Sequence, residues 1–231
     1  MRLVVVGTSH IAKQSIEEIK TIIEEEKPEI VALELDFNRL QALLSKRRAH
    51  LRLGDIKRVG LKGYLFALFG GFVQKKLGKS VGVMPGSEMV QAITLAKHYN
   101  LHIALIDQNI ETTLRRFSAA FGWKERFRFL ADVFKGIFFK GKMMEQFRGF
   151  DLRTVPKDEL IEKMVEQVKE RYPSIYRVLI EERNKVMIKN LKQLLENNPD
   201  KKVLAVIGAG HKKAIEAALN GFMRTSERKS I

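Results

Sequence analysis

The chain has 231 residues, of which 45% are hydrophobic and 30% charged, as is typical of a globular protein with one large domain or two small ones. Cysteine is absent, which excludes disulfide frameworks, thiol nucleophiles, cysteine-ligated zinc and Fe–S clusters. The longest uncharged apolar stretch, residues 63–74, is well short of the roughly 20 residues that a spanning helix needs. Since no signal-peptide pattern opens the chain either, it is not expected to cross a membrane.

Apolar runs alternate with segments of helical spacing along most of the chain. A strand is predicted at 2–7, a helix at 11–26 and a second strand at 30–35, which together form a βαβ unit with parallel strands. Further helices are predicted at 38–52, 60–79 and 88–98, followed by a third strand at 101–106. Helices at 110–150, 157–171 and 173–195, a strand at 202–207 and a closing helix complete the order. This order predicts an α/β fold with a mixed or mostly parallel central sheet flanked by helices.

The net charge of +15 is concentrated in two segments. Residues 41–80 hold ten Lys or Arg and one acid, a net charge of +9, and residues 111–150 hold nine Lys or Arg and four acids, a net charge of +5. The second segment also contains nine of the fourteen Phe and the only Trp, Trp123. We interpret residues 1–231 as a single domain with two basic helical insertions, and we expect residues 58–79 and 111–150 to pack together as a helical cap over the functional site.

Polar residues follow each predicted strand, and in parallel sheets ligands collect at the carboxyl ends of the strands. The first strand leads into Gly7-Thr-Ser-His10 and the last into Gly208-Ala-Gly-His211. Glu34 and Asp36 end the second strand, and Asp107 follows the third. A helix N-terminus after each Gly-x-x-His turn would keep the imidazole neutral.

Two chemistries fit this set. His10, His211 and Glu34 would form a two-histidine, one-carboxylate metal site that activates water. Without a metal, the same groups would act as a general base with an acid that orients it. Structural roles are the alternatives: helix capping for the histidines and for Asp107, and for Glu34 a salt bridge to Arg183 or Arg39. A dinucleotide site is disfavoured, because the third glycine of the fingerprint and the ribose-binding acid are missing.

Two more charged residues are expected near this edge of the sheet. Glu88 lies in the first turn of the helix that follows Met84-Pro-Gly86, where the helix dipole alone would favour an acid. Arg183 shares an otherwise apolar helix face with Met187, so we expect it to be buried and paired with Glu34, Glu88 or Asp107.

Seven motifs in order resemble the TraB/PrgY/GumN family, which includes the Tiki proteins, over about residues 3–219. They are Gly7-Thr-Ser-His10, Val31-Ala-Leu-Glu-Leu-Asp36 with Arg39, Pro85-Gly-Ser-Glu-Met89, Asp107, Leu114-Arg-Arg116, Glu182-Arg-Asn184 and Gly208-Ala-Gly-His211. TraB and PrgY are associated with shutdown of peptide pheromones, and Tiki proteins are described as metal-dependent proteases. The resemblance implies roles for His10, His211 and Glu34, with Glu88, Asp107, Arg116 and Arg183 in support.

Two features depart from the family pattern. Gln108 stands where relatives often have arginine, and the sequence ends at Ile231 after a basic tail, where many relatives continue into membrane-spanning segments. We therefore expect either a protein of the cytoplasm or the membrane periphery, or a piece of a longer one.

The resulting hypothesis is a peptidase-type hydrolase that depends on a divalent metal (Mn, Co or Zn), in which Arg183 or Arg116 holds a substrate carboxylate or an oxyanion. The alternative is a non-catalytic module that binds and sequesters a pheromone-like peptide at a membrane surface. The expected partners are a peptide and an anionic membrane, and homo-oligomerisation is left open. Nucleic-acid binding is the least favoured reading, since the basic segments contain no known nucleic-acid motif.

Overall fold

A four-stranded parallel sheet forms the centre of the protein in a computed structural model, which describes residues 3–8, 13–45, 53–81, 86–138 and 158–229. The strands are β1 (Leu3–Thr8), β2 (Ile30–Leu33), β3 (His102–Leu105) and β4 (Val203–Gly208). Their order in the sheet is β1-β4-β2-β3, and all three neighbouring pairs are parallel. The predicted α/β class is confirmed, and the described sheet is purely parallel rather than mixed.

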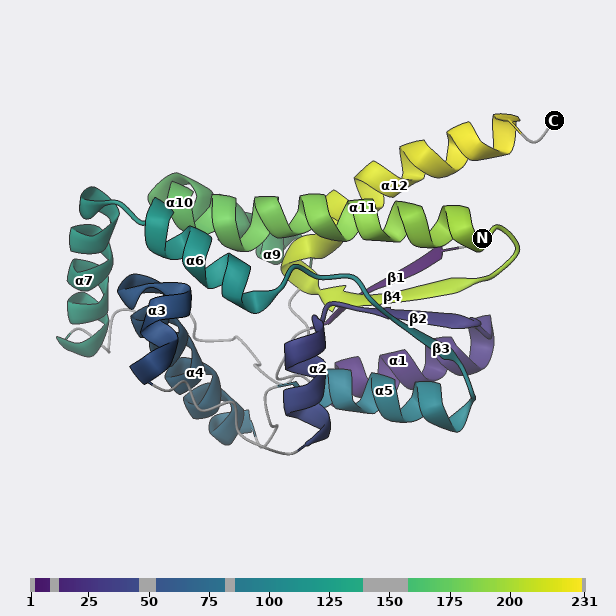
Figure 1. Cartoon of the computed structure of the whole chain (residues 1–231), viewed down its shortest axis with the longest axis horizontal. Helices are drawn as coiled ribbons and strands as arrows, with labels where there is room; N and C mark the ends of the chain where they lie inside the picture. The colour runs from purple at the N-terminus through teal and green to yellow at the C-terminus, as the bar shows by residue number, and fades with distance from the viewer. Residues whose placement is uncertain (1–2, 9–12, 46–52, 82–85, 139–157, 230–231) are drawn as a thin grey trace.

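Helices connect the strands and extend the molecule at one end (Figure 1). The described helices in chain order are α1 (Lys13–Glu26), α2 (Phe37–Leu44), η1 (Leu53–Asp55), α3 (Ile56–Val59), α4 (Leu61–Val81), α5 (Ser87–His98), α6 (Ile110–Ala120), α7 (Trp123–Phe138), α9 (Asp158–Arg171), α10 (Pro173–Tyr176), the π-helical turn η2 (Arg177–Glu181), α11 (Glu182–Asn197) and α12 (Ala209–Lys229).

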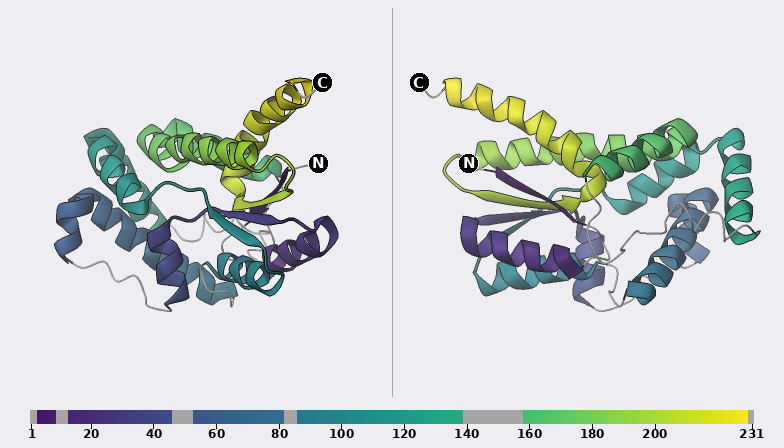
Figure 2. Two further views of the ribbon diagram at one scale, coloured as in Figure 1. Left: turned by 45° about the vertical axis from the view of Figure 1, so that its right-hand side comes forward. Right: turned by 180° about the vertical axis from the view of Figure 1, so that it is seen from behind.

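Each face of the sheet is covered by helices, because successive strand side chains point to opposite sides. On one face Val31, Leu33 and Val206 pack with residues of α1 and α5. On the other face Ile30 and Ala205 join residues of α11 and α12. Figure 2 shows the resulting layers from two sides. The nearly unbroken apolar sequence of β4, all of it buried, is what a strand between two helical layers requires.

The two basic segments pack against each other, as far as they lie within the described residues. Phe66 of α4 contacts Phe117 of α6 with ring centroids 4.2 Å apart, and Phe69 of α4 meets Phe129 of α7 edge-on at 5.4 Å. Phe117 in turn packs on Val178 of η2. The predicted association of residues 58–79 with 111–138 is therefore present, while residues 139–150 lie outside the described part of the chain.

Several predicted helices have different limits. The helix predicted at 38–52 ends at Leu44, and residues 46–52 lie outside the described part. The segment 110–150 is broken at Phe121-Gly122, and the single helix predicted from Pro173 contains the π-helical turn. In the described part of the chain, no helix combines the length and apolarity needed to cross a bilayer.

Gly63 provides a test of how α4 packs on α6. A Cβ atom built at Gly63 would lie 2.4 Å from the carbonyl oxygen of Leu114, so a side chain would force the two helices apart. We expect Gly63→Ala to lower the free energy of unfolding by about 1–3 kcal/mol in a urea titration, as overpacking does elsewhere. Gly70→Ala on the same helix meets no atom within 4 Å and is the matched control. The control should be neutral or stabilising, since alanine favours a helix over glycine by about 1 kcal/mol. Equal effects of both substitutions would show that α4 does not approach α6 this closely.

Candidate functional site

Arg183 lies at the centre of a buried polar cluster where the strands end. It occupies the first turn of α11, and its Nη1 donates a hydrogen bond to the Leu179 carbonyl of η2 at 3.2 Å. The π-helical turn changes the direction of the side chains that follow it, which is one reason why such turns recur at functional sites. The guanidinium is thereby directed toward the sheet, and its side chain is 16% exposed.

Two carboxylates from neighbouring strands bind this guanidinium, as predicted. Nη2 of Arg183 donates to Glu34 Oε1 and to Asp107 Oδ2, the latter at 2.5 Å, and Nε lies 3.1 Å from Asp107 Oδ1. Burial lowers the pKa of Arg183. The charge of Glu34 and the hydrogen bonds and charge of Asp107 raise this pKa by more than burial lowers it, so the net shift is upward. Arg183 is therefore a fixed cation, compensated by two acids with less than 4% side-chain exposure.

The ion-pair chain continues toward α2. Arg39 donates from Nη2 to Asp107 and from Nε to Asp36 Oδ2 at 2.7 Å. Asp36 also caps α2, since its Oδ1 accepts from the backbone amides of Asn38 and Arg39. Acids and arginines thus alternate across the edge of the sheet, and each carboxylate has a cationic partner.

His211 completes the cluster from the first turn of α12. Its Nδ1 lies 2.6 Å from Asn184 Oδ1, its Nε2 lies 3.2 Å from Arg183 Nη1, and Nε2 is 3.5 Å from Glu34 Oε1. The amide oxygen of Asn184 can only accept a hydrogen bond, so Nδ1 carries the ring proton. Arginine can only donate, so Nε2 accepts the hydrogen bond from Arg183 Nη1.

These groups form part of the floor of a cleft of about 470 Å³. Glu34, Arg183 and His211 line it together with Thr8 and Gly208 at the ends of β1 and β4. The wall is an apolar stripe of α9 at helical spacing, made of Ile161, Met164, Val165 and Val168. The cleft is thus polar at its base and apolar along one side.

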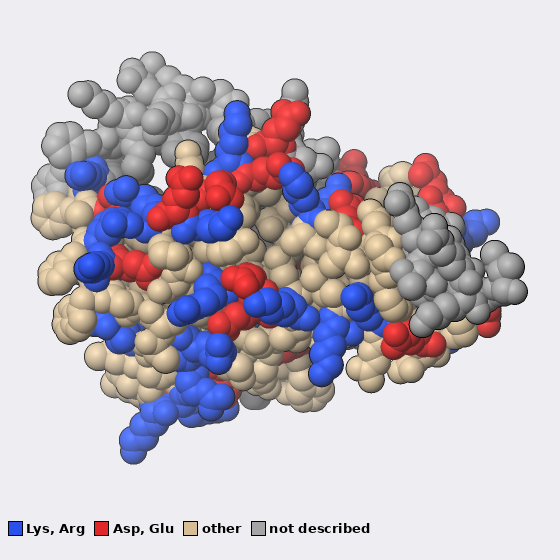
Figure 3. Space-filling view, turned by 90° about the horizontal axis from the view of Figure 1, so that it is seen from above, with Lys and Arg blue, Asp and Glu red and all other residues tan. Residues whose placement is uncertain are grey.

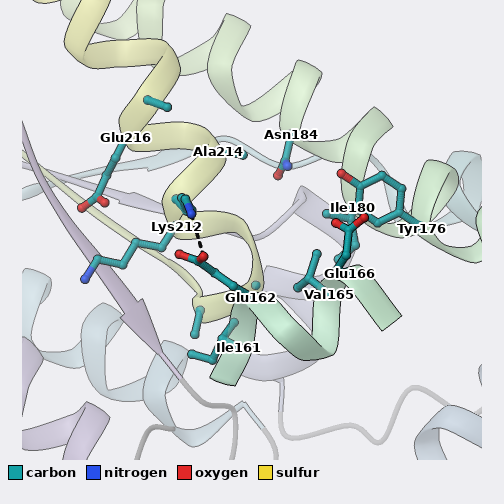
Figure 4. Close-up of a pocket in the computed structure, with 14 residues that line it drawn as sticks. Ile161, Glu162, Val165, Glu166, Tyr176, Ile180, Asn184, Lys212, Ala214 and Glu216 are labelled. Atoms are coloured by element: carbon teal, nitrogen blue, oxygen red, sulfur yellow. Dashed lines mark ion pairs between the residues drawn. The ribbon is translucent and has the colours of Figure 1, made fainter. Parts of the chain in front are cut away.

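A second cavity of about 500 Å³ adjoins the first and shares Ile161, Val165 and Ile180 with it. Figure 4 shows Glu162 and Glu166 of α9, Tyr176 of α10 and Glu216 of α12 around this cavity. Glu162 forms an ion pair with Lys213 at 2.6 Å. The two cavities together follow α9 past the beginning of α12.

The other predicted site residues have different surroundings. Glu88 is buried in the first turn of α5 with 1% exposure. Arg116 lies on α6, where its half-exposed guanidinium pairs with Glu182, and it does not line the described cleft. Asp107 does not cap α6, because Asn109 does so and the amide of Ile110 donates to Asp36 instead. His10 lies outside the described residues.

Sequence reasoning missed the roles of α9 and Asn184. The apolar stripe of α9 was visible as helical spacing, but nothing in the sequence indicated that it faces the strand ends. Asn184 was part of the Glu182-Arg-Asn184 motif, and its proximity to His211 depends on the packing of α11 against α12. The expected position of the basic cap over the cleft is wrong in the described part of the chain, since the lining there includes no residue of α3, α4, α6 or α7.

Two donor atoms have a spacing that suits a divalent metal. Glu34 Oε1 and His211 Nε2 are 3.5 Å apart, as two ligands of one ion would be, but the Arg183 guanidinium contacts both of them in this structure. Within the described residues, no group of three His, Asp or Glu side chains is arranged to hold a metal. The third predicted ligand is His10, so the three-ligand site remains a prediction.

The fold and cluster define an α/β protein with a histidine, glutamate and arginine site at the carboxyl edge of a parallel sheet. The sequence model of the TraB/PrgY/gumN family matches residues 2–221. The chain belongs to this family.

Relatives from distant organisms share this similarity. The "Uncharacterized protein MJ1365" of Methanocaldococcus jannaschii is 34% identical over 215 residues, which cover 91% of this chain and 51% of the relative. The "TraB domain-containing protein" of Mus musculus is 25% identical over 243 residues, and that of Homo sapiens is 23% identical over 241 residues. The mouse and human alignments each cover 93% of this chain and 62% of the relative. The chain therefore spans between half and two thirds of the length of the three relatives.

Proposed function

We propose that this protein is a hydrolase of peptides and that the cleft beside α9 is its active site. The observation that carries the proposal is the convergence of Glu34, His211 and Arg183 at the base of a cleft with an apolar wall. Ligand sites in α/β proteins lie at this edge of the sheet. A polar base with one apolar side suits a peptide, whose backbone is polar and whose side chains are often apolar.

Each residue has a distinct role in this proposal. His211 presents an unprotonated Nε2, held by the bond from Nδ1 to Asn184, and accepts a proton from the attacking water. Arg183 would exchange its contact with His211 Nε2 for the carbonyl oxygen or terminal carboxylate of the peptide, which frees Nε2 to accept the proton. Glu34 fixes Arg183 and accepts from the Gly208 amide, which ties the base of the cleft to β4.

A divalent metal is the alternative within this proposal, held by Glu34 and His211 with His10 as a further ligand, and His211 Nε2 would then bind the ion instead of accepting the proton. When bound, such an ion would supply Lewis acidity to the hydrolysis. The apolar stripe of α9 would bind an apolar peptide side chain.

The test is cleavage of a mixture of quenched fluorescent peptides by the purified protein with Mn, Co or Zn added, or with chelator. We expect cleavage next to apolar residues, loss of cleavage with chelator, and loss in Glu34→Gln. Binding of the same peptides without cleavage under any metal condition would contradict hydrolysis and support the sequestering module. If the peptides are neither cleaved nor bound, the cleft is not a peptide site and the proposal fails.

A further inference from the structure

The helix α7 carries a row of apolar side chains that are mostly exposed to solvent. Trp123, Phe127, Leu130 and Phe134 follow each other at helical spacing and are between 62% and 68% exposed. The rings of Trp123 and Phe127 are stacked with centroids 6.1 Å apart. We call these four residues the α7 row. Exposed aromatic residues in a continuous row indicate an interaction surface.

The opposite side of α7 is packed against the protein, which fixes the direction of the row. Phe129 contacts the rings of Phe69, Phe121 and Tyr172, with centroids between 5.4 and 6.2 Å apart. In all three ribbon views α7 lies at the end of the molecule far from both described termini (Figures 1 and 2). The row is thus presented outward by an anchored helix.

The charged side chains of α7 also differ between the packed side of the helix and its exposed side. Both acids face partners of the fold: Glu125 accepts from the Ser174 amide at 2.8 Å, and Asp132 pairs with Arg171. The hydrogen bond from Arg171 holds the pKa of Asp132 below its ordinary value, although burial opposes the shift. Two of the bases, Lys124 and Lys135, are exposed, and the half-buried Arg126 is stacked 4.3 Å from the centroid of the Trp123 ring.

The face seen in Figure 3 does not show this separation of charges, since Lys and Arg lie there beside Asp and Glu. Ion pairs elsewhere among the described residues include Lys185 with Glu181 and Arg116 with Glu182. On α7, by contrast, Lys124 and Lys135 are exposed while both acids contact residues of other helices.

We propose that α7 docks this protein on an anionic phospholipid bilayer, with the α7 row inserted at the level of the headgroups and its flanking bases on the lipid phosphates. Trp and Phe favour the boundary between headgroups and acyl chains. Lys and Arg are attracted by the negative surface potential, and salt weakens that attraction. Charge complementarity favours this occupant over a second copy of the chain, because two α7 surfaces would bring like charges together.

The only tryptophan, Trp123, reports directly on docking. We expect its emission to shift to shorter wavelength with vesicles of equimolar phosphatidylcholine and phosphatidylglycerol, and to be quenched when the lipids carry brominated acyl chains. Vesicles of phosphatidylcholine alone should cause no shift, and high salt should reverse it. Absence of a shift with the anionic vesicles at low salt would overturn the proposal.

Two matched pairs of variants separate the contributions. The double variant Phe127→Gln/Phe134→Gln should reduce the vesicle partition coefficient at least about tenfold. The control double variant Leu44→Gln/Val90→Gln, which replaces exposed apolar residues outside α7, should leave it unchanged. Lys124→Glu with Lys135→Glu should also reduce it, while Lys20→Glu with Lys185→Glu changes the net charge equally and should have a smaller effect.

The same variants test the other occupants. If the phenylalanine pair abolishes a dimer seen by sedimentation velocity, the surface belongs to a second copy and the proposal fails. If it lowers the melting temperature instead, another part of this chain covers the row and the proposal also fails. Peptide cleavage by these variants should be unchanged, because α7 does not line the described cleft.

Discussion

Replacing Arg183 by alanine is expected to lower the free energy of unfolding by about 3–5 kcal/mol. Glu34 and Asp107 would then remain buried without the cation that now compensates both. Uncompensated buried charge costs more than the loss of any single exposed ion pair, because solvent cannot screen it. Urea titration followed by circular dichroism measures the effect.

Arg177→Ala is the matched control for this experiment. Arg177 lies six residues earlier, in η2, and is exposed, so its removal should change stability by no more than about 0.5 kcal/mol. The loss of unfolding free energy in Arg183→Lys should lie between those of Arg183→Ala and Arg177→Ala. Lysine keeps the positive charge but lacks the forked guanidinium that reaches both carboxylates. If Arg183→Ala unfolds at the same urea concentration as the control, the carboxylates are not held as this geometry implies.

Replacing His211 by alanine is expected to reduce kcat for peptide cleavage by about 10²–10⁴-fold, the range for removal of a general base. Its neighbour Asn184 holds the ring through Nδ1 at 2.6 Å without lining the first cleft. Asn184→Ala should therefore reduce kcat by about 10–100-fold with little change in KM, as loss of a positioning partner does.

The control for both variants is His102→Ala. His102 is exposed at the beginning of β3, at the edge of the sheet away from the site, and its removal should leave kcat unchanged. Melting temperatures are needed for each variant, because His211 is only 4% exposed and its loss also affects packing. A His211→Ala protein that is folded and cleaves peptides at the wild-type rate would remove His211 from the mechanism.

Local sequence patterns were sufficient to predict most of the fold. The apolar runs form a parallel sheet, of which β2 and β4 are fully buried. Polar residues that follow the strands meet at one edge, because parallel strands place their carboxyl ends together. Arg183 was predicted to pair with a carboxylate because an arginine on an apolar face cannot be buried alone. The family motifs, spread from residue 7 to residue 211, pointed to the same edge.

Tertiary packing determined what the local patterns left open. The strand order β1-β4-β2-β3 joins Thr8 to Gly208 across almost the whole chain, and no local spacing specifies such a pairing. The same packing places the apolar stripe of α9 beside the cleft. From the sequence alone this could not be predicted, because apolar residues have the same helical spacing whether they face the core or a binding site. The packing also leaves the α7 row exposed and turns the acids of α7 inward, whereas helical spacing alone left open which side of this helix faces the core. Periodicity defines the apolar side of a helix, but the element it faces depends on long-range contacts that bury the most apolar surface of the whole chain.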